Sequence, residues 1–146
     1  MTEPEATIVI TSYNRQEYLR KAITSALEQE GSYEILVVDD ASSDGSAEMV
    51  RKEFPEVTLS VSDERLGLIV QRNRAARRAR APIVVNIDDD ILFSSRQVMK
   101  QVIASFDHPR IGAVAIPHIN FIGDRREPWF PDLPDRVLET KARKFT

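Results

Sequence analysis

The stretch Ile83-Val84-Val85-Asn86-Ile87-Asp88-Asp89-Asp90 decides how the chain is organised. An apolar, largely β-branched run, typical of a strand buried on both faces, ends at once in three consecutive carboxylates. Adjacent carboxylates repel one another, and each loses stability when it is buried without a partner. Solvation at the surface is the simplest way to accommodate them. At the end of a buried strand, however, a divalent cation is the natural partner, and carboxylate oxygens suit Mg²⁺ or Mn²⁺.

Length and composition restrict the class of protein. The chain has 146 residues, which is enough for one domain with a substantial core. Its net charge of −3 gives no reason to expect nucleic acid as a partner, and the absence of cysteine excludes disulfides and thiolate metal sites. No apolar run is long enough for a transmembrane segment, and the acidic N-terminus is not a signal peptide. We therefore expect a cytoplasmic protein, for which peripheral docking on a membrane stays open.

Strand-like and helical patterns alternate along the chain. Apolar runs predict five strands, and apolar residues at helical spacing predict a helix after each of the first four strands. This order predicts a three-layer α/β/α domain with a mostly parallel sheet. The third strand alternates apolar and polar residues, as expected at the edge of a sheet. The five strands are expected at residues 6–11, 34–38, 57–61, 82–87 and 111–116.

Local signals set the expected ends of the helices. Asn14, followed three residues later by Glu17, resembles a capping box for the first helix, and Gly31 would end that helix. Ser43 or Asp44 would cap the second helix, and Ser94 or Ser95 the fourth.

The third helix would open at Gly67 and carry Arg72 on a face rich in alanine, so that Arg72 points toward the strand ends. A solvated basic stripe would lie on another face of that helix: Arg74, Arg77 and Arg78.

The regular pattern fails after Pro117. Residues 120–146 are rich in proline, arginine and aspartate, with one weak helical pattern at residues 137–144. We expect a core at residues 1–118, followed at residues 119–146 by an irregular extension or by the start of a shortened acceptor-binding half. His118 is expected to be structural, because no second histidine or acid cluster accompanies it at the spacing of metal ligands.

Distinctive polar residues follow three of the predicted strands. The first strand ends in Thr11-Ser12-Tyr13, the second in Asp39-Asp40 and the fourth in Asp88-Asp89-Asp90. Because ligands of open α/β sheets bind beyond the carboxyl ends of parallel strands, these side chains and Arg72 should meet at one edge. Neither a GxGxxG nor a GxxxxGKS/T phosphate loop occurs, so a metal and side chains would have to balance phosphate charge. An aromatic ring, acceptors, a cation and an acid cluster together suit a nucleoside diphosphate.

Four motifs at these boundaries resemble family 2 of the inverting glycosyltransferases, which have the GT-A fold. The motifs are ATIVITSYNR at 6–15, ILVVDDASSDG at 35–45, RN at 72–73 and DDD at 88–90. Each motif is weak alone, but four in this order are specific, and the resemblance covers about residues 6–116. It implies transfer of a sugar from a nucleotide-sugar donor, expected to be a UDP-sugar, to an acceptor hydroxyl. The acceptor would be a saccharide or a lipid-linked saccharide, as in polysaccharide biosynthesis.

The resemblance also implies a role for individual residues. Thr11 and Tyr13 would line the pocket of the nucleotide base, with Tyr13 against the ring. Asp40 would accept a hydrogen bond from the base, and Asp39 would support the same loop. Arg72 would lie near the base or the diphosphate.

The acid triplet would hold the metal. Asp88 would contact the ribose directly or through the metal, Asp90 would ligate the Mn²⁺ or Mg²⁺ that bridges the diphosphate, and Asp89 would shape the turn. The cation would stabilise the leaving nucleoside diphosphate as a Lewis acid. In the resembled family a later acidic motif supplies the catalytic base, and we assign no base here because no remaining acid stands in such a motif. Arg65 stands where many relatives have asparagine, which leaves the donor contact of that loop open.

Other interpretations stay open beside this one. The chain could be a nucleotide-binding or nucleotide-sugar-binding module without turnover, and its short C-terminal part also fits a shortened protein or a piece of a longer one. A nucleotidyltransferase is disfavoured, because a glycine-rich basic loop would replace residues 11–14. A carboxylate-based phosphohydrolase is disfavoured as well, because it would carry a nucleophilic aspartate where Thr11 stands.

Overall fold

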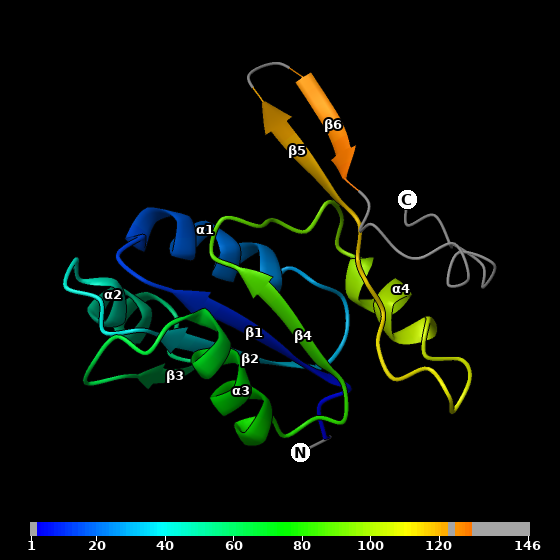
Figure 1. Cartoon of the computed structure of the whole chain (residues 1–146), viewed down its shortest axis with the longest axis horizontal. Helices are drawn as coiled ribbons and strands as arrows, with labels where there is room; N and C mark the ends of the chain where they lie inside the picture. The colour runs from blue at the N-terminus through cyan, green and yellow to red at the C-terminus, as the bar shows by residue number, and fades with distance from the viewer. Residues whose placement is uncertain (1–2, 123–124, 130–146) are drawn as a thin grey trace. The chain divides into compact units, whose positions relative to one another are not determined.

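The computed structural model describes residues 3–122 and 125–129 (Figure 1). Contacts divide the chain into two units, residues 1–103 and residues 104–146, and each is described by itself. No helix in the described part is long and apolar enough to cross a membrane. The elements in chain order are β1 (Ala6–Ser12), α1 (Gln16–Leu27), β2 (Tyr33–Asp39), α2 (Ser46–Glu53), β3 (Thr58–Val61), α3 (Leu68–Arg78), β4 (Val84–Asp88), α4 (Val98–Ala104), β5 (His118–Ile122) and β6 (Arg125–Trp129).

The first unit is built on a four-stranded parallel sheet in the order β3-β2-β1-β4. This confirms the predicted α/β class and the predicted edge position of β3. In the register of the sheet, Thr11 of β1 lies between Val38 of β2 and Asp88 of β4, and Ser12 pairs with Asp39. The three strands with polar ends therefore stop level with one another, and their carboxyl ends form one edge.

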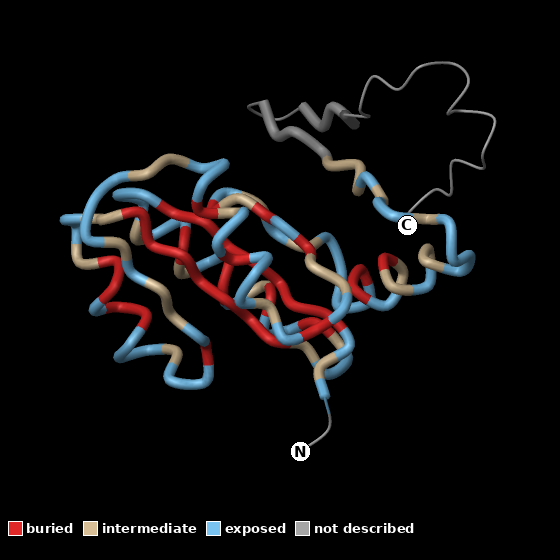
Figure 2. The backbone as a smooth tube through the Cα atoms, turned by 60° about the horizontal axis from the view of Figure 1, so that its bottom comes forward, coloured by how far each residue is buried: buried red, intermediate tan, exposed pale blue. Residues whose placement is uncertain are grey.

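The core lies on both faces of β1 and β2. All seven residues of β1 are buried, which is why its apolar run shows no alternation, and Figure 2 shows the central strands as continuous buried segments. Val9 and Leu36 pack with Ala75 of α3 on one face. Since side chains alternate along a strand, Ile8 and Ile10 point to the opposite face, where α1 contacts β1, β2 and α2. The result is the predicted three-layer arrangement.

Two predicted helix signals need correction. The capping box at Asn14 is wrong, because Arg15 is the N-cap of α1 and its own side chain makes no capping hydrogen bond. Asn14 instead adopts a left-handed backbone, with φ 52°, and its Oδ1 accepts the backbone N–H of Ser43. The helix also ends at Leu27, before Gly31.

Asp44, one of the two residues predicted to cap α2, serves both helices. Its Oδ1 accepts the N–H of Ser46 at 3.0 Å, and its Oδ2 accepts the N–H of Gln16 at 2.9 Å. These are the first residues of α2 and α1, and their N–H groups have no partner within a helix. A single carboxylate in the loop after β2 thus fixes the starts of two helices.

The predicted fifth strand at residues 111–116 is wrong. These residues form no strand, and the second unit instead holds the antiparallel hairpin β5–β6. The sequence pattern after Pro117 had predicted irregular structure for the residues of this hairpin. An apolar run becomes a strand only when another strand accepts its backbone hydrogen bonds, and none pairs with residues 111–116 in the described part of the chain. The predicted boundary at residue 118 stays a prediction, and the predicted helix at 137–144 lies outside the described residues.

Candidate functional site

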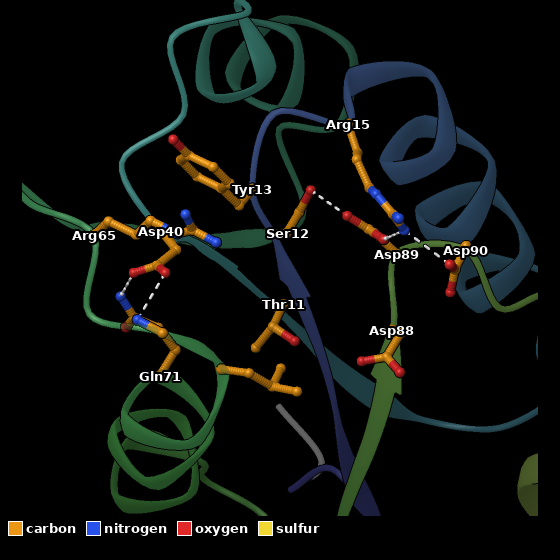
Figure 3. A pocket seen from close by; sticks show the side chains of 12 residues that line it. Thr11, Ser12, Tyr13, Arg15, Asp40, Arg65, Gln71, Asp88, Asp89 and Asp90 are labelled. Carbon is orange, nitrogen blue, oxygen red and sulfur yellow. Dashed lines mark hydrogen bonds and ion pairs between the residues drawn. The ribbon is translucent and has the colours of Figure 1, made fainter.

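A pocket of about 380 Å³ lies at the carboxyl ends of β1, β2 and β4 and at the start of α3 (Figure 3). It is the position that open parallel sheets use for ligands. Its walls come from four separate segments that the fold brings together. The lining residues are Thr11, Ser12, Tyr13, Arg15, Asp40, Arg65, Gly67, Leu68, Gln71, Asp88, Asp89 and Asp90.

Tyr13 and Arg65 form one wall of the pocket. The guanidinium carbon of Arg65 lies 4.2 Å from the centre of the Tyr13 ring, within the range of a cation–π contact. Tyr13 is 37% exposed, so part of the residue is accessible to a ligand. A flat ring with a stacked guanidinium suits a planar, aromatic ligand such as a nucleotide base.

Asp40 is a buried carboxylate that ties β2 to the start of α3. Its Oδ1 accepts the N–H of Leu66 at 2.8 Å and the Nε2–H of Gln71 at 2.5 Å, and its Oδ2 accepts the N–H of Gly67 at 2.9 Å. Burial raises the pKa of Asp40, but the hydrogen bonds from Gln71, Leu66 and Gly67 outweigh it and leave the pKa below its usual value. The group is therefore an anion at neutral pH.

Gln71 is a pocket residue that sequence reasoning missed. It is 1% exposed, and its Nε2 donates to Ser62 as well as to Asp40. It therefore orients Asp40 and links it to the loop after β3.

Thr11 carries a buried hydroxyl that is available to hydrogen-bond a ligand. The residue is buried, it lines the pocket, and its Oγ1 has no hydrogen-bond partner among the described residues. Buried hydroxyls in folded proteins are nearly always satisfied, so an unpartnered one in a pocket wall is a candidate hydrogen-bonding group for a ligand.

The backbone after β1 and β2 is strained where it enters the pocket. Asn14 follows Tyr13 with φ 52°, and Ala41 follows Asp40 with φ 64°. Asparagine tolerates the left-handed region, but alanine adopts it only at a cost of about 1–2 kcal/mol. Asp39 contributes to holding this turn, because its Oδ1 accepts the N–H of Ser42 at 2.8 Å. Such strain is concentrated at functional sites, where the surrounding structure fixes the conformation.

Each member of the acid triplet has a different environment. Asp88 is half-exposed, and its Oδ1 accepts from Nη2 of Arg72 at 2.7 Å. Asp89 is buried, and its Oδ2 accepts the hydroxyl of Ser12 at 2.7 Å. Asp90 is exposed, and its contact is an ion pair of 2.8 Å between its Oδ2 and Nη1 of Arg15.

Arg15, also missed by sequence reasoning, joins two of these acids. The same Nη1 that contacts Asp90 lies 3.1 Å from Oδ1 of Asp89. Hydrogen bonds from Arg15 to Asp90 and then to Asp89 raise the pKa of the guanidinium. Two carboxylates therefore converge on one point, and a cationic group occupies it.

The donor chemistry of the triplet fits a hard divalent cation. Carboxylate oxygens are the ligands that Mg²⁺ and Mn²⁺ prefer, and two of them already surround a positive group. Within the described residues, however, no three acid or histidine side chains converge on one metal position. The protein would thus supply only part of the coordination, and the remaining ligands would come from water or from a bound phosphate.

Two predicted site residues lie behind the pocket wall. Asp39 is fully buried and supports the loop, as described above. Arg72 reaches the strand ends as its helix face predicts and pairs there with Asp88, but it is not a lining residue. Thr11, Tyr13, Asp40, Asp88 and Asp90, by contrast, do line one pocket.

Comparisons with known proteins agree with this geometry. The family described as Glycosyl transferase family 2 matches residues 7–145. The uncharacterized glycosyltransferase YfnE of Bacillus subtilis is 31% identical over 103 residues, which are 67% of this chain and 26% of YfnE, so the chain spans only part of that relative.

Two solved structures share the fold. A mannosyltransferase from Pyrobaculum calidifontis in complex with GDP-Man and Mn²⁺ superposes with a TM-score of 0.68 at 28% identity, over 76% of this chain and 34% of that one. TarS of S. aureus in complex with UDP-GlcNAc superposes with a TM-score of 0.62 at 26% identity, over 70% of this chain and 31% of that one.

Proposed function

The chain belongs to glycosyl transferase family 2, and from this membership we propose that it binds a nucleotide-sugar donor for transfer of the sugar to an acceptor hydroxyl. The observation that carries the proposal is the pocket at the strand ends. It brings a stacked aromatic ring, a buried carboxylate and three consecutive aspartates together. A base would use the ring and the buried carboxylate, and the ribose and the diphosphate with its cation would use the aspartates.

The base would lie at the Tyr13 end of the pocket. Its ring would stack on Tyr13, with Arg65 either beside it or displaced from the tyrosine ring by the base. Asp40 is ionised and acts only as an acceptor, so it would take a base N–H with a lone pair that its present donors leave free. The unpartnered Thr11 hydroxyl would supply a further hydrogen bond. A uracil, which has one imino N–H, fits this arrangement, and we propose a UDP-sugar as the donor.

The diphosphate would lie at the acid triplet, together with Mn²⁺ or Mg²⁺. Asp90 would ligate the cation, and Asp88 would contact the ribose or share the cation. When bound, the metal would act as a Lewis acid that stabilises the leaving diphosphate. Arg72 holds Asp88 in place through its ion pair and would keep that carboxylate oriented during the reaction.

The reaction would exchange the bond between the sugar and the diphosphate for a glycosidic bond between the sugar and the acceptor. The acceptor oxygen would attack the anomeric carbon, the bond from that carbon to the diphosphate oxygen would break, and the nucleoside diphosphate would leave. Attack from the face opposite the leaving group gives the inverted product. A general base must take the acceptor proton, and we assign this role to no residue. The acceptor, its expected place in polysaccharide synthesis and the expected cytoplasmic location stay predictions.

Calorimetry with UDP, in the presence and absence of Mn²⁺, tests the proposal. We expect UDP to bind, to bind more tightly with Mn²⁺, and to bind more tightly than GDP. An affinity for UDP that Mn²⁺ does not change would contradict the assignment of the acid triplet to the metal and diphosphate. Hydrolysis of a panel of UDP-sugars, measured as the UDP released, then distinguishes an enzyme from a module that binds without turnover.

A further inference from the structure

Arg15 lies at a position that a small cation would also favour. Its Nη1 is 2.8 Å from Oδ2 of Asp90 and 3.1 Å from Oδ1 of Asp89, so one nitrogen bridges two carboxylates (Figure 3). In the described part of the chain, this is the one point at which two members of the acid triplet pair with the same atom.

Internal counter-ions explain how the chain tolerates three adjacent aspartates. Asp88 pairs with Arg72, whereas Asp89 and Asp90 share Arg15. Ser12 satisfies the second oxygen of the buried Asp89, which therefore depends on Arg15 for its other oxygen. Without Arg15, a buried carboxylate would keep one partner and an exposed carboxylate would keep none among the described residues.

The two arginines are not equally fixed. The Arg72 side chain is 29% exposed and projects from the middle of α3. Arg15 is 50% exposed and stands at the N-cap position of α1, and among the described residues its further contact is a long cation–π approach of 5.7 Å to the Tyr18 ring. A half-exposed arginine keeps much of its rotamer freedom and can leave its partners at little cost. Arg15 can therefore exchange with another cation, whereas Arg72 is better placed to remain.

We propose that Arg15 is a built-in competitor for the divalent cation. In the free chain it occupies the point between Asp89 and Asp90, and it moves away when Mn²⁺ or Mg²⁺ binds there. This inference rests on the proposed function, because it takes the acid triplet as the metal site. Its consequence is that the chain binds a divalent cation weakly in the absence of nucleotide, since the cation must first displace the guanidinium.

Binding of Mn²⁺ to the full chain, measured by the electron paramagnetic resonance signal of free Mn²⁺ in the absence of nucleotide, tests the proposal. We expect Arg15→Gln to bind Mn²⁺ about three- to tenfold more tightly than the wild type, which is the size expected for losing two partly exposed ion pairs. Arg15→Lys keeps the charge and should remain within about twofold of the wild type.

Arg20→Gln is the matched control for net charge. Arg20 also lies on α1, but it pairs with Glu17 and Glu53 and contacts none of the three aspartates. The variant loses the same charge and should change the affinity for Mn²⁺ by less than about twofold. An equal gain in both variants would mean that only long-range charge matters, and it would overturn the proposal.

The remaining outcomes are equally decisive. Unchanged or weaker binding of Mn²⁺ to Arg15→Gln would show that Arg15 does not compete for this position. If Arg15→Gln fails to fold by circular dichroism, a charge-keeping Arg15→Lys that loses Mn²⁺ binding would overturn the proposal, and one that matches the wild type would support it. If UDP with Mn²⁺ binds to the wild type while Arg15→Gln gains nothing, only this inference fails. If UDP does not bind at all, the proposed function fails.

Discussion

Replacing Asp40 with asparagine should both destabilise the fold and weaken nucleotide binding. The substitution preserves shape but exchanges one acceptor oxygen for a donor NH₂ group. In the wild type, Oδ1 receives two donors, from Leu66 and Gln71, and Oδ2 receives one donor, from Gly67. Asparagine would place its oxygen on the side with two donors. Its NH₂ group would then face the N–H of Gly67, which would lose its partner.

The size of the effect follows from these contacts. A partly buried N–H without an acceptor costs about 1–3 kcal/mol, and two hydrogen bonds that lose their charged acceptor weaken by about 0.5–1 kcal/mol each. The free energy of unfolding should therefore fall by about 2–5 kcal/mol. The affinity for UDP should fall by at least about tenfold, because the loop of residues 65–67 positions Arg65 against Tyr13.

The stability should also change its dependence on pH. The folded state lowers the pKa of Asp40, so its carboxylate stabilises the fold at pH values above about 4, the value for an unfolded aspartate. That contribution is lost as the pH falls through the lower pKa of the folded state. Asp40→Asn lacks the titrating group, and its stability should therefore decline less steeply than that of the wild type below pH 4.

Urea denaturation between pH 2.5 and 7, with UDP calorimetry at pH 7, measures both effects. Asp63→Asn is the matched control, because Asp63 is exposed in the nearby loop and makes no hydrogen bond or ion pair among the described residues. It should alter the free energy of unfolding by less than about 0.5 kcal/mol. If Asp40→Asn lowers the affinity for UDP but leaves the free energy of unfolding and its pH dependence unchanged, then Asp40 does not anchor the start of α3, and our reasoning is wrong.

Substitutions at three further positions test separate parts of the molecule. Tyr13→Ala should weaken UDP binding about ten- to hundredfold in calorimetry by removing a stacked ring, while Tyr13→Phe should bind UDP nearly as well as the wild type. Asp90→Ala should abolish the gain in UDP affinity that Mn²⁺ provides, and a gain of wild-type size would remove Asp90 from the metal site. Glu34→Gln, at the opposite end of the sheet, should lower the free energy of unfolding by about 1–3 kcal/mol, because the buried carboxylate accepts from Thr7 and Arg80. Its UDP affinity should not change, and a loss there would mean that the two ends of the sheet are coupled.

The parallel sheet and its functional edge could be predicted because both depend on strong, local patterns. Continuous apolar runs ended at Thr11, Asp39 and Asp88 within the length of a strand, and parallel pairing then forced these ends to meet. The run at residues 111–116 looked equally good, but its sequence contains no information about whether a partner strand is present. Strand formation at that position depends on pairing with another segment, which no local pattern reveals.

The contacts inside the pocket were less predictable than its location. Gln71 shares a face of α3 with Ala75, so its spacing could have suggested burial, but nothing in the sequence identifies Asp40 as its acceptor. Arg15 follows a residue with a left-handed backbone, and a capping box was expected there. The direction of the Arg15 side chain follows from that turn and could not be read from residue type. Side-chain partners in loops depend on such backbone details, whereas strand ends do not.

The electrostatics of the acid triplet predict that the binding of the metal and the binding of the nucleotide are coupled. Within the described residues at most two carboxylates converge on one point, and a guanidinium already satisfies them. A cation alone would gain few ligands there and would lose solvation, so its affinity should be low. A diphosphate at the same place would add oxygen ligands and negative charge, and both favour the cation. Because linkage is reciprocal, the factor by which UDP tightens Mn²⁺ binding must equal the factor by which Mn²⁺ tightens UDP binding. A factor well above one would show that the two ligands are coupled, and Asp90→Ala should bring both factors close to one if the coupling arises at the acid triplet.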